Sequence, residues 1–138
     1  MANVSIEFLG ATETVTGSRF LLTGEKSQIL IDAGLFQGTA EIKAKNWDPF
    51  PIKPSSIDAV VLTHAHLDHT GYLPLLVKQG FSGPVYCTEY TAKLVSVILL
   101  DSARIQMEDA KYAQKKGYSS HSNPRALYDD QMLPKPLS

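Results

Sequence analysis

The chain has little cysteine, almost no net charge and no long apolar run. Cys87 is the only cysteine among 138 residues, so no intramolecular disulfide can form, as is typical of proteins from reducing compartments. The longest apolar stretch, residues 94–100, is too short to cross a bilayer, and residues 1–9 lack the basic start and apolar centre of a signal peptide. These absences predict a cytoplasmic protein with no membrane partner.

Charge is nearly balanced, with 13 Lys and Arg against 14 Asp and Glu and a net charge of -1. A protein that binds nucleic acid mainly through its own phosphate contacts is usually basic. Composition therefore gives no support for that class, although a local basic patch is compatible with it. The length corresponds to about one domain, and 43% hydrophobic residues are enough to build a core.

Short stretches of alternating or continuous apolar residues predict five strands. The first three are separated by turn-rich segments, so we expect them to form an antiparallel meander. The fourth is continuously apolar, as in a strand that is buried on both faces. The predicted strands cover residues 4–8, 19–23, 28–31, 59–62 and 85–87.

Two segments predict helices of different length. The shorter runs from about Thr70 to residue 79, with Gly80 just after its end. The longer covers residues 89–116, where apolar residues recur at spacings of three and four. Thr88 is its predicted cap and Gly117 its stop.

Three other regions carry weaker signals. Residues 48–54 contain three prolines, which excludes a helix or a central strand. Cys87 lies at the end of an apolar run, and we expect a small buried side chain. Residues 118–138 show little periodicity and predict an irregular tail, with His121 in an exposed polar loop.

One stretch, residues 63–71, holds three of the four histidines of the chain. His64, His66, Asp68 and His69 form the pattern H-x-H-x-D-H directly after a predicted buried strand. Residues two apart in an extended segment point the same way, so His64 and His66 can present both imidazoles to one ion. Asp68 and His69 follow where the chain turns into a helix and can reach a second ion.

Mixed imidazole and carboxylate ligands suit zinc best, with manganese or iron as alternatives. Two such ions would clamp an oxyanion or phosphate. A buried cluster without metal would instead place three imidazoles and a carboxylate side by side with poor compensation. The pattern therefore predicts a metal site of a hydrolase.

With these motifs, the chain resembles the metallo-β-lactamase superfamily. The H-x-H-x-D-H pattern marks only the superfamily. The flanking Val-Thr-Gly-Ser and Leu-Phe-Gln-Gly stretches are similar to those of its β-CASP branch of RNA-processing nucleases. The stretches that carry the likeness are residues 8–11, 15–18, 31–38, 62–74 and 80–86.

The resemblance implies an α/β fold, namely the first half of an αββα sandwich with a mostly antiparallel or mixed sheet and helices on one face. It implies that His64 and His66 bind one zinc ion and that Asp68 and His69 bind another. Asp68 would also handle the protons of the attacking water. Asp32 would orient the site from behind the ligands, whereas from the sequence alone it is a turn residue before Gly34.

The family also uses a further histidine, a bridging aspartate and a last histidine. After His69 this chain has only His121, in a setting that matches no ligand motif. We therefore expect residues 1–138 to be a single, incomplete domain, with residues 1–117 ordered. An exposed sheet face and self-association are expected consequences.

Three functions remain open. The first is a metal-dependent RNA phosphodiesterase, with RNA as the substrate of the complete enzyme. The second is another hydrolase on the same fold, such as a thioesterase or lactonase. The third is a non-catalytic scaffold subunit of an RNA-processing complex, which the four intact ligand positions disfavour.

Overall fold

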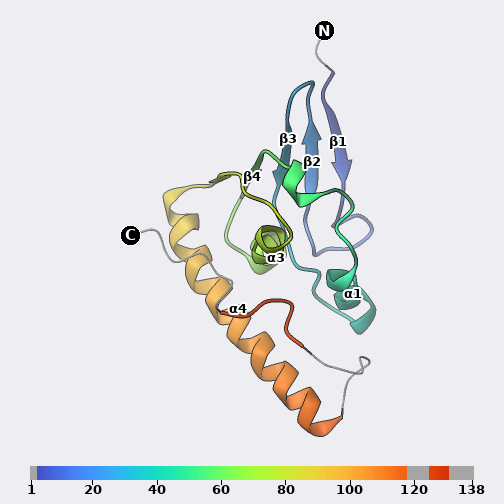
Figure 1. Cartoon of the computed structure of the whole chain (residues 1–138), viewed down its shortest axis with the longest axis vertical. Coiled ribbons are helices and arrows are strands. Elements are labelled where there is room, and N and C mark those ends of the chain that lie inside the picture. The colour runs from blue at the N-terminus through green and yellow to red at the C-terminus, as the bar shows by residue number, and fades with distance from the viewer. Residues whose placement is uncertain (1–2, 118–124, 131–138) are drawn as a thin grey trace.

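The computed structural model describes residues 3–117 and 125–130 and shows a five-stranded mixed sheet (Figure 1). The sheet order is β1-β2-β3-β4-β5. Strands β1 to β3 pair antiparallel, whereas β3–β4 and β4–β5 pair parallel, so the α/β class and the predicted meander are confirmed. The strands are Ser5–Phe8, Phe20–Thr23, Gln28–Ile31, Ala59–Val61 and Val85–Tyr86.

The helices of the described residues lie in the segments that follow β3, β4 and β5. Helix α4 has the bounds and both ends predicted from sequence. Its cap Thr88 accepts a hydrogen bond from the Thr91 amide at 3.2 Å, and Gly117 ends it in the left-handed conformation at φ 71°. The helices are α1 Ala40–Ala44, α2 Leu67–Thr70, α3 Leu73–Lys78 and α4 Glu89–Lys116, with 3-10 turns η1 Lys45–Trp47 and η2 Pro54–Ser56.

The predicted start of the short helix at Thr70 is wrong. Thr70 closes α2, and α3 starts at Leu73. The physical reason lies between them: the Tyr72 amide donates to the carbonyl of Ala33, 2.8 Å away, instead of continuing the helix ladder. A tertiary hydrogen bond to the loop after β3 therefore divides the segment into two helices.

The core lies on one face of the sheet. Leu21, Leu30 and Val60 are cross-strand neighbours, and all three are fully buried. Leu30 and Val60 pack with residues of the helices that lie on the same side in Figure 1, among them Leu76 of α3 and Leu99 of α4. Val60 is buried, but Ala59 and Val61 are only half-buried, so β4 is not covered on both faces as expected.

The opposite face of the sheet is apolar and open. The pairing register places Ile6 beside Leu22 and Phe8 beside Phe20, on the face away from the core. Ile6 is 57% exposed and Phe8 is 66% exposed. We call this surface the outer face; its residues are Ile6, Phe8, Phe20, Leu22, Ile29, Ile31, Val61 and Tyr86.

Cys87 is exposed, so the predicted burial of this thiol is wrong. It follows β5, which has only two residues and forms one edge of the sheet. Both residues of β5 are exposed, so this strand end offers no core in which a small side chain would be covered.

Residues 125–130 form neither helix nor strand, yet they pack on α4 (Figure 1). Tyr128 is fully buried, and its hydroxyl lies 3.1 Å from the Ser102 hydroxyl. The Leu127 amide donates to the side-chain carbonyl of Gln106 at 3.0 Å. Burial raises the pKa of the Tyr128 phenol, against the hydrogen bonds to Ser102 and Gln106. His121 lies outside the described residues.

No helix within residues 3–117 and 125–130 is long and apolar enough to cross a membrane.

We predict that Tyr128→Ala lowers the free energy of unfolding by about 3–5 kcal/mol, because it empties a buried aromatic site. Urea denaturation followed by circular dichroism measures the change. Tyr112, which is 60% exposed on α4, provides the matched control, and Tyr112→Ala should stay within about 0.5 kcal/mol of wild type. Equal effects of the two substitutions would contradict the anchoring of residues 125–130.

Candidate metal centre

The histidine cluster lies where two parallel strands end side by side. Strands β3 and β4 are paired in parallel, so the segments that follow them leave the same edge of the sheet. The segment after β3 begins with Asp32, and the segment after β4 contains residues 63–66 before α2 begins. The Asp32 amide donates to the Val61 carbonyl at 2.8 Å, which continues the pairing up to the site.

Backbone hydrogen bonds join these segments to α2. The Ala33 amide donates to the carbonyl of His69 at 2.8 Å, and the Leu35 amide donates to the carbonyl of Leu67 at 3.2 Å. The Ser18 amide donates to the carbonyl of Asp68 at 3.0 Å. The backbone of both residues proposed for the second ion is therefore held from outside the helix.

Gly34 is required by close packing at this junction. A Cβ atom at this position would lie 1.7 Å from the Asp68 carbonyl oxygen and 2.8 Å from the Ser18 amide nitrogen. The Gly34 amide also donates to the Ser18 carbonyl at 3.0 Å. Only glycine allows the three segments to meet this closely.

The Asp32 carboxylate is the centre of the hydrogen-bond network. It is 2% exposed and sits in the left-handed region at φ 61°. Its Oδ1 accepts from the Thr63 amide, and its Oδ2 accepts from the Thr63 hydroxyl, each at 2.8 Å. Its Oδ2 also lies 2.8 Å from Nδ1 of His69.

This network sets the proton positions on two imidazoles. A carboxylate only accepts hydrogen bonds, so His69 donates from Nδ1. The Thr63 hydroxyl gives its proton to Asp32 and therefore accepts from Nδ1 of His64, 2.9 Å away. In both neutral rings the lone pair then lies on Nε2, the arrangement that metal-binding histidines use.

The rings of the cluster are neighbours. The centroids of His64 and His69 lie 3.9 Å apart, and those of His64 and His66 lie 4.9 Å apart. Nε2 of His69 lies 3.4 Å from Oδ2 of Asp68. Leu67 turns from the cluster and packs against the core.

The donor set fits a metal ion chemically. Nε2 of His69 and Oδ2 of Asp68 are both electron-pair donors when the ring is neutral, and a cation between them would reconcile their proximity. Within the part of the chain that the structure describes, no three His, Cys, Asp or Glu side chains are gathered closely enough to hold a metal. Binding would therefore have to draw these side chains together.

Two contributors were not assigned a role from sequence. For Thr63, the hydroxyl directly before the first histidine is the available signal. Residues 15–18 carry the family likeness without a predicted role, but the Ser18 amide donates to the carbonyl of Asp68 on α2. Backbone contacts of this kind leave no signature in side-chain types.

The fold and the cluster together define a class of protein. The sequence model of the metallo-beta-lactamase superfamily matches residues 14–106. The chain belongs to this superfamily.

Individual relatives are much longer than this chain. It is 46% identical over 99 residues to Ribonuclease TTHA0252 of Thermus thermophilus, covering 72% of this chain and 22% of the relative. It is 42% identical over 113 residues to Transcription termination factor FttA of Methanosarcina mazei, covering 78% of this chain and 17% of that relative. A solved metallo-beta-lactamase of Cronobacter sakazakii is 23% identical with a TM-score of 0.46, covering 94% of this chain and 40% of that one.

We predict that Gly34→Ala lowers the free energy of unfolding by about 3 kcal/mol or more, because the new methyl group meets backbone that cannot move aside. Gly24→Ala is the matched control, since its nearest neighbour would be 3.9 Å away, and we expect a change of less than about 1 kcal/mol. Denaturant unfolding measures both. Similar stabilities of the two variants would contradict the close junction.

We also predict that His64 and His69 carry their neutral-state proton on Nδ1 in the metal-free protein. Thr63→Val should release only His64 from this tautomer, because His69 keeps its direct bond to Asp32. Nitrogen-15 NMR of the imidazoles under alkaline conditions distinguishes the tautomers. His66, which has no such partner among the described hydrogen bonds, serves as the internal control. An unchanged His64 in the Thr63→Val protein would exclude the hydroxyl link.

Proposed function

We propose that the chain carries part of the catalytic zinc centre of an RNA phosphodiesterase of the β-CASP branch. The observation that carries the proposal is the shared support of His64 and His69 by Asp32, which leaves Nε2 of both rings available. The RNA substrate is proposed because one relative is named a ribonuclease and another a transcription termination factor. We also propose a cytoplasmic location, in keeping with the single cysteine.

His64 and His66 would hold one ion, and Asp68 and His69 would hold a second. When bound, zinc ions supply a Lewis acid, an activated water and compensation for charge on the phosphate oxygens. Asp32 keeps two imidazoles oriented, His69 directly and His64 through the Thr63 hydroxyl. Asp68, whose side chain is 24% exposed, would accept a proton from the attacking water.

The four proposed ligands fill only part of two coordination shells. The chain spans about a fifth of the length of the relatives it matches, and His121 is its only other histidine. We therefore propose that further ligands come from outside these 138 residues, so the chain alone should hydrolyse RNA poorly. The open outer face supports a second layer over the sheet or self-association through it.

The first test is metal binding by the purified chain. We expect zinc binding that a chelator reverses. His64→Ala or His69→Ala should weaken it by at least about 100-fold, since changes behind the ligands already cost about 10–100-fold. Asp32→Asn should fall within that smaller range. His121→Ala is the histidine control and should bind as wild type does. Absence of zinc binding by both this chain and the longest form of the protein that its gene encodes would overturn the proposal and favour a scaffold role.

The second test concerns the substrate. Labelled single-stranded RNA and a thioester are offered to the longest form of the protein that its gene encodes. We expect chelator-sensitive cleavage of RNA and little hydrolysis of the thioester. The reverse preference would identify a small-molecule hydrolase. Robust cleavage of RNA by the 138-residue chain alone would show that its metal site is already complete.

A further inference from the structure

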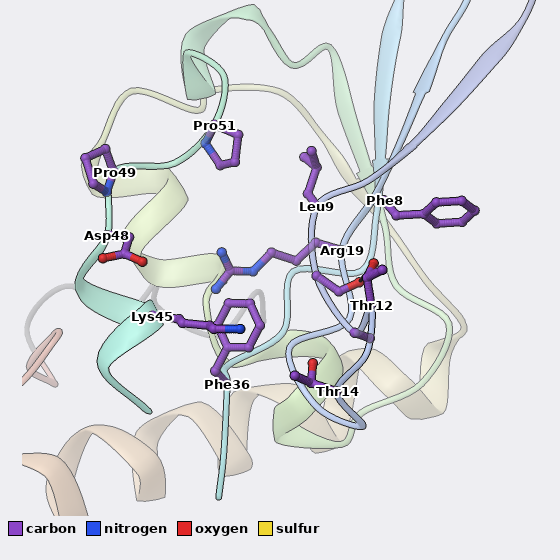
Figure 2. A pocket seen from close by; sticks show the side chains of 12 residues that line it. Phe8, Leu9, Thr12, Thr14, Arg19, Phe36, Lys45, Asp48, Pro49 and Pro51 are labelled. Atoms are coloured by element: carbon purple, nitrogen blue, oxygen red, sulfur yellow. Dashed lines mark hydrogen bonds between the residues drawn. The ribbon is translucent and has the colours of Figure 1, made fainter. Parts of the chain in front are cut away.

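A cavity of about 300 Å³ lies beside the loop after β1 and none of the clustered histidines lines it (Figure 2). One wall comes from residues 8–14 and the other from residues 45–51, with Arg19 and Phe36 between them. Three charged side chains line this cavity, namely the cations Arg19 and Lys45 and the anion Asp48.

Arg19 is a buried cation that pairs with no carboxylate of residues 3–117 and 125–130. The residue is 4% exposed, and Nε donates to the Gly34 carbonyl at 3.0 Å. Its Nη2 is buried and has no hydrogen-bond partner within the described residues. No ion pair among those residues includes Arg19. Such an unpaired buried donor is costly unless something else satisfies it.

Aromatic rings surround the guanidinium but cannot replace an acceptor. Its central carbon lies 4.0 Å from the ring centroid of Tyr72, 4.7 Å from that of Phe36 and 5.6 Å from that of Phe50. These faces stabilise a cation and exclude water around it. Burial lowers the pKa of Arg19 to about 10, against the electrostatic effect of Tyr72, so the group stays charged at neutral pH.

A second cation lies at the same cavity. Nζ of Lys45 lies 5.6 Å from the ring centroid of Phe36, the ring that Arg19 also contacts. Figure 2 shows both side chains beside this ring, with Asp48 on the same wall as Lys45. The hydroxyl-bearing residues Thr12 and Thr14 complete the polar part of the lining.

We propose that this cavity binds a phosphate group between the Arg19 guanidinium and the Lys45 ammonium. A guanidinium presents several N–H groups in a plane that matches phosphate oxygens, and a lysine adds a mobile point charge. Because Nη2 is covered, the Arg19 side chain must turn towards the cavity when the anion enters. Asp48 opposes the anion and limits its affinity.

The cavity is connected to the candidate metal centre by the backbone. Arg19 follows Ser18, whose amide holds the Asp68 carbonyl, and Arg19 itself holds the Gly34 carbonyl. A phosphate in the cavity would thus bind Arg19, the residue directly after Ser18, whose amide donates to the Asp68 carbonyl. The proposal rests on the proposed function only for the source of the phosphate, which is either the RNA backbone or a free nucleotide.

The test uses the 138-residue chain with a chelator present, so that phosphate at the metal centre cannot contribute. Inorganic phosphate is titrated while NMR follows backbone amides and the Arg19 Nε–H. We expect saturable shifts at residues 10–14, 19, 36 and 45–48. Shifts centred on residues 64–69, or no saturable shift, would overturn the proposal.

Variants at three exposed positions, Lys43, Lys45 and Asp48, separate binding from folding, and a fourth variant changes the buried Arg19. Lys45→Gln should weaken phosphate binding about three- to tenfold, and Asp48→Asn should tighten it about twofold. Lys43→Gln, a neighbouring exposed lysine that does not line the cavity, should have no effect. Arg19→Lys keeps the charge but loses the planar fork, and should weaken binding about tenfold. Equal affinity in the Lys45 and Lys43 variants would overturn the proposal.

The source of the phosphate is distinguished by comparing three probes under the same conditions. They are inorganic phosphate, a 5′-mononucleotide and a short single-stranded RNA. Tighter binding of RNA, lost in Lys45→Gln, supports a backbone phosphate; tighter binding of the mononucleotide supports a free ligand. Zinc binding by the same variants is measured in parallel, so failure of the phosphate site and failure of the metal centre give separate results.

Discussion

The candidate centre depends on the hydrogen bonds that the Asp32 carboxylate accepts. Asp32 directly follows β3 in a left-handed conformation, and its two oxygens accept hydrogen bonds from Thr63, near the start of the segment after β4. One buried charge thereby joins the strands and sets the orientation of two imidazoles. The desolvation of such a charge is offset by three hydrogen-bond donors, all at 2.8 Å. Losing any of these donors would leave the carboxylate undercompensated.

The backbone of Ser18 and Gly34 contacts two polar regions of opposite character. The Ser18 amide donates to the carbonyl of Asp68, in the cluster of imidazoles and carboxylates that suits a cation. The Gly34 carbonyl accepts from Arg19, which suits an anion together with its aromatic neighbours. Because the two regions share these backbone contacts, a displacement of either segment would alter both regions. The absence of a Cβ at Gly34 is what allows Ser18 and Asp68 to approach so closely.

Features with a local cause were predictable from the sequence. Thr88 and Gly117 define α4 because a cap and a stop act within one turn. The rings of His64, His66 and His69 are neighbours, as their closeness in sequence implies, and their role as metal ligands stays a prediction. Features with a tertiary cause were not. The break before Leu73 depends on a hydrogen bond to Ala33, and the burial of Arg19 depends on rings that are distant in sequence. Cys87 was misjudged because an edge strand looks like a buried one in its residue types.

Substitutions on the outer face would affect the folding of this chain and its assembly or activity differently. Ile6 and Phe8 are more than half exposed, so their side chains contribute little to the stability of this chain. A saturation mutagenesis screen that scores only abundance or folding would rate polar substitutions there as neutral or favourable. The apolar outer face nonetheless extends over all five strands of the sheet. Only a screen that scores assembly or activity would detect a requirement for these side chains.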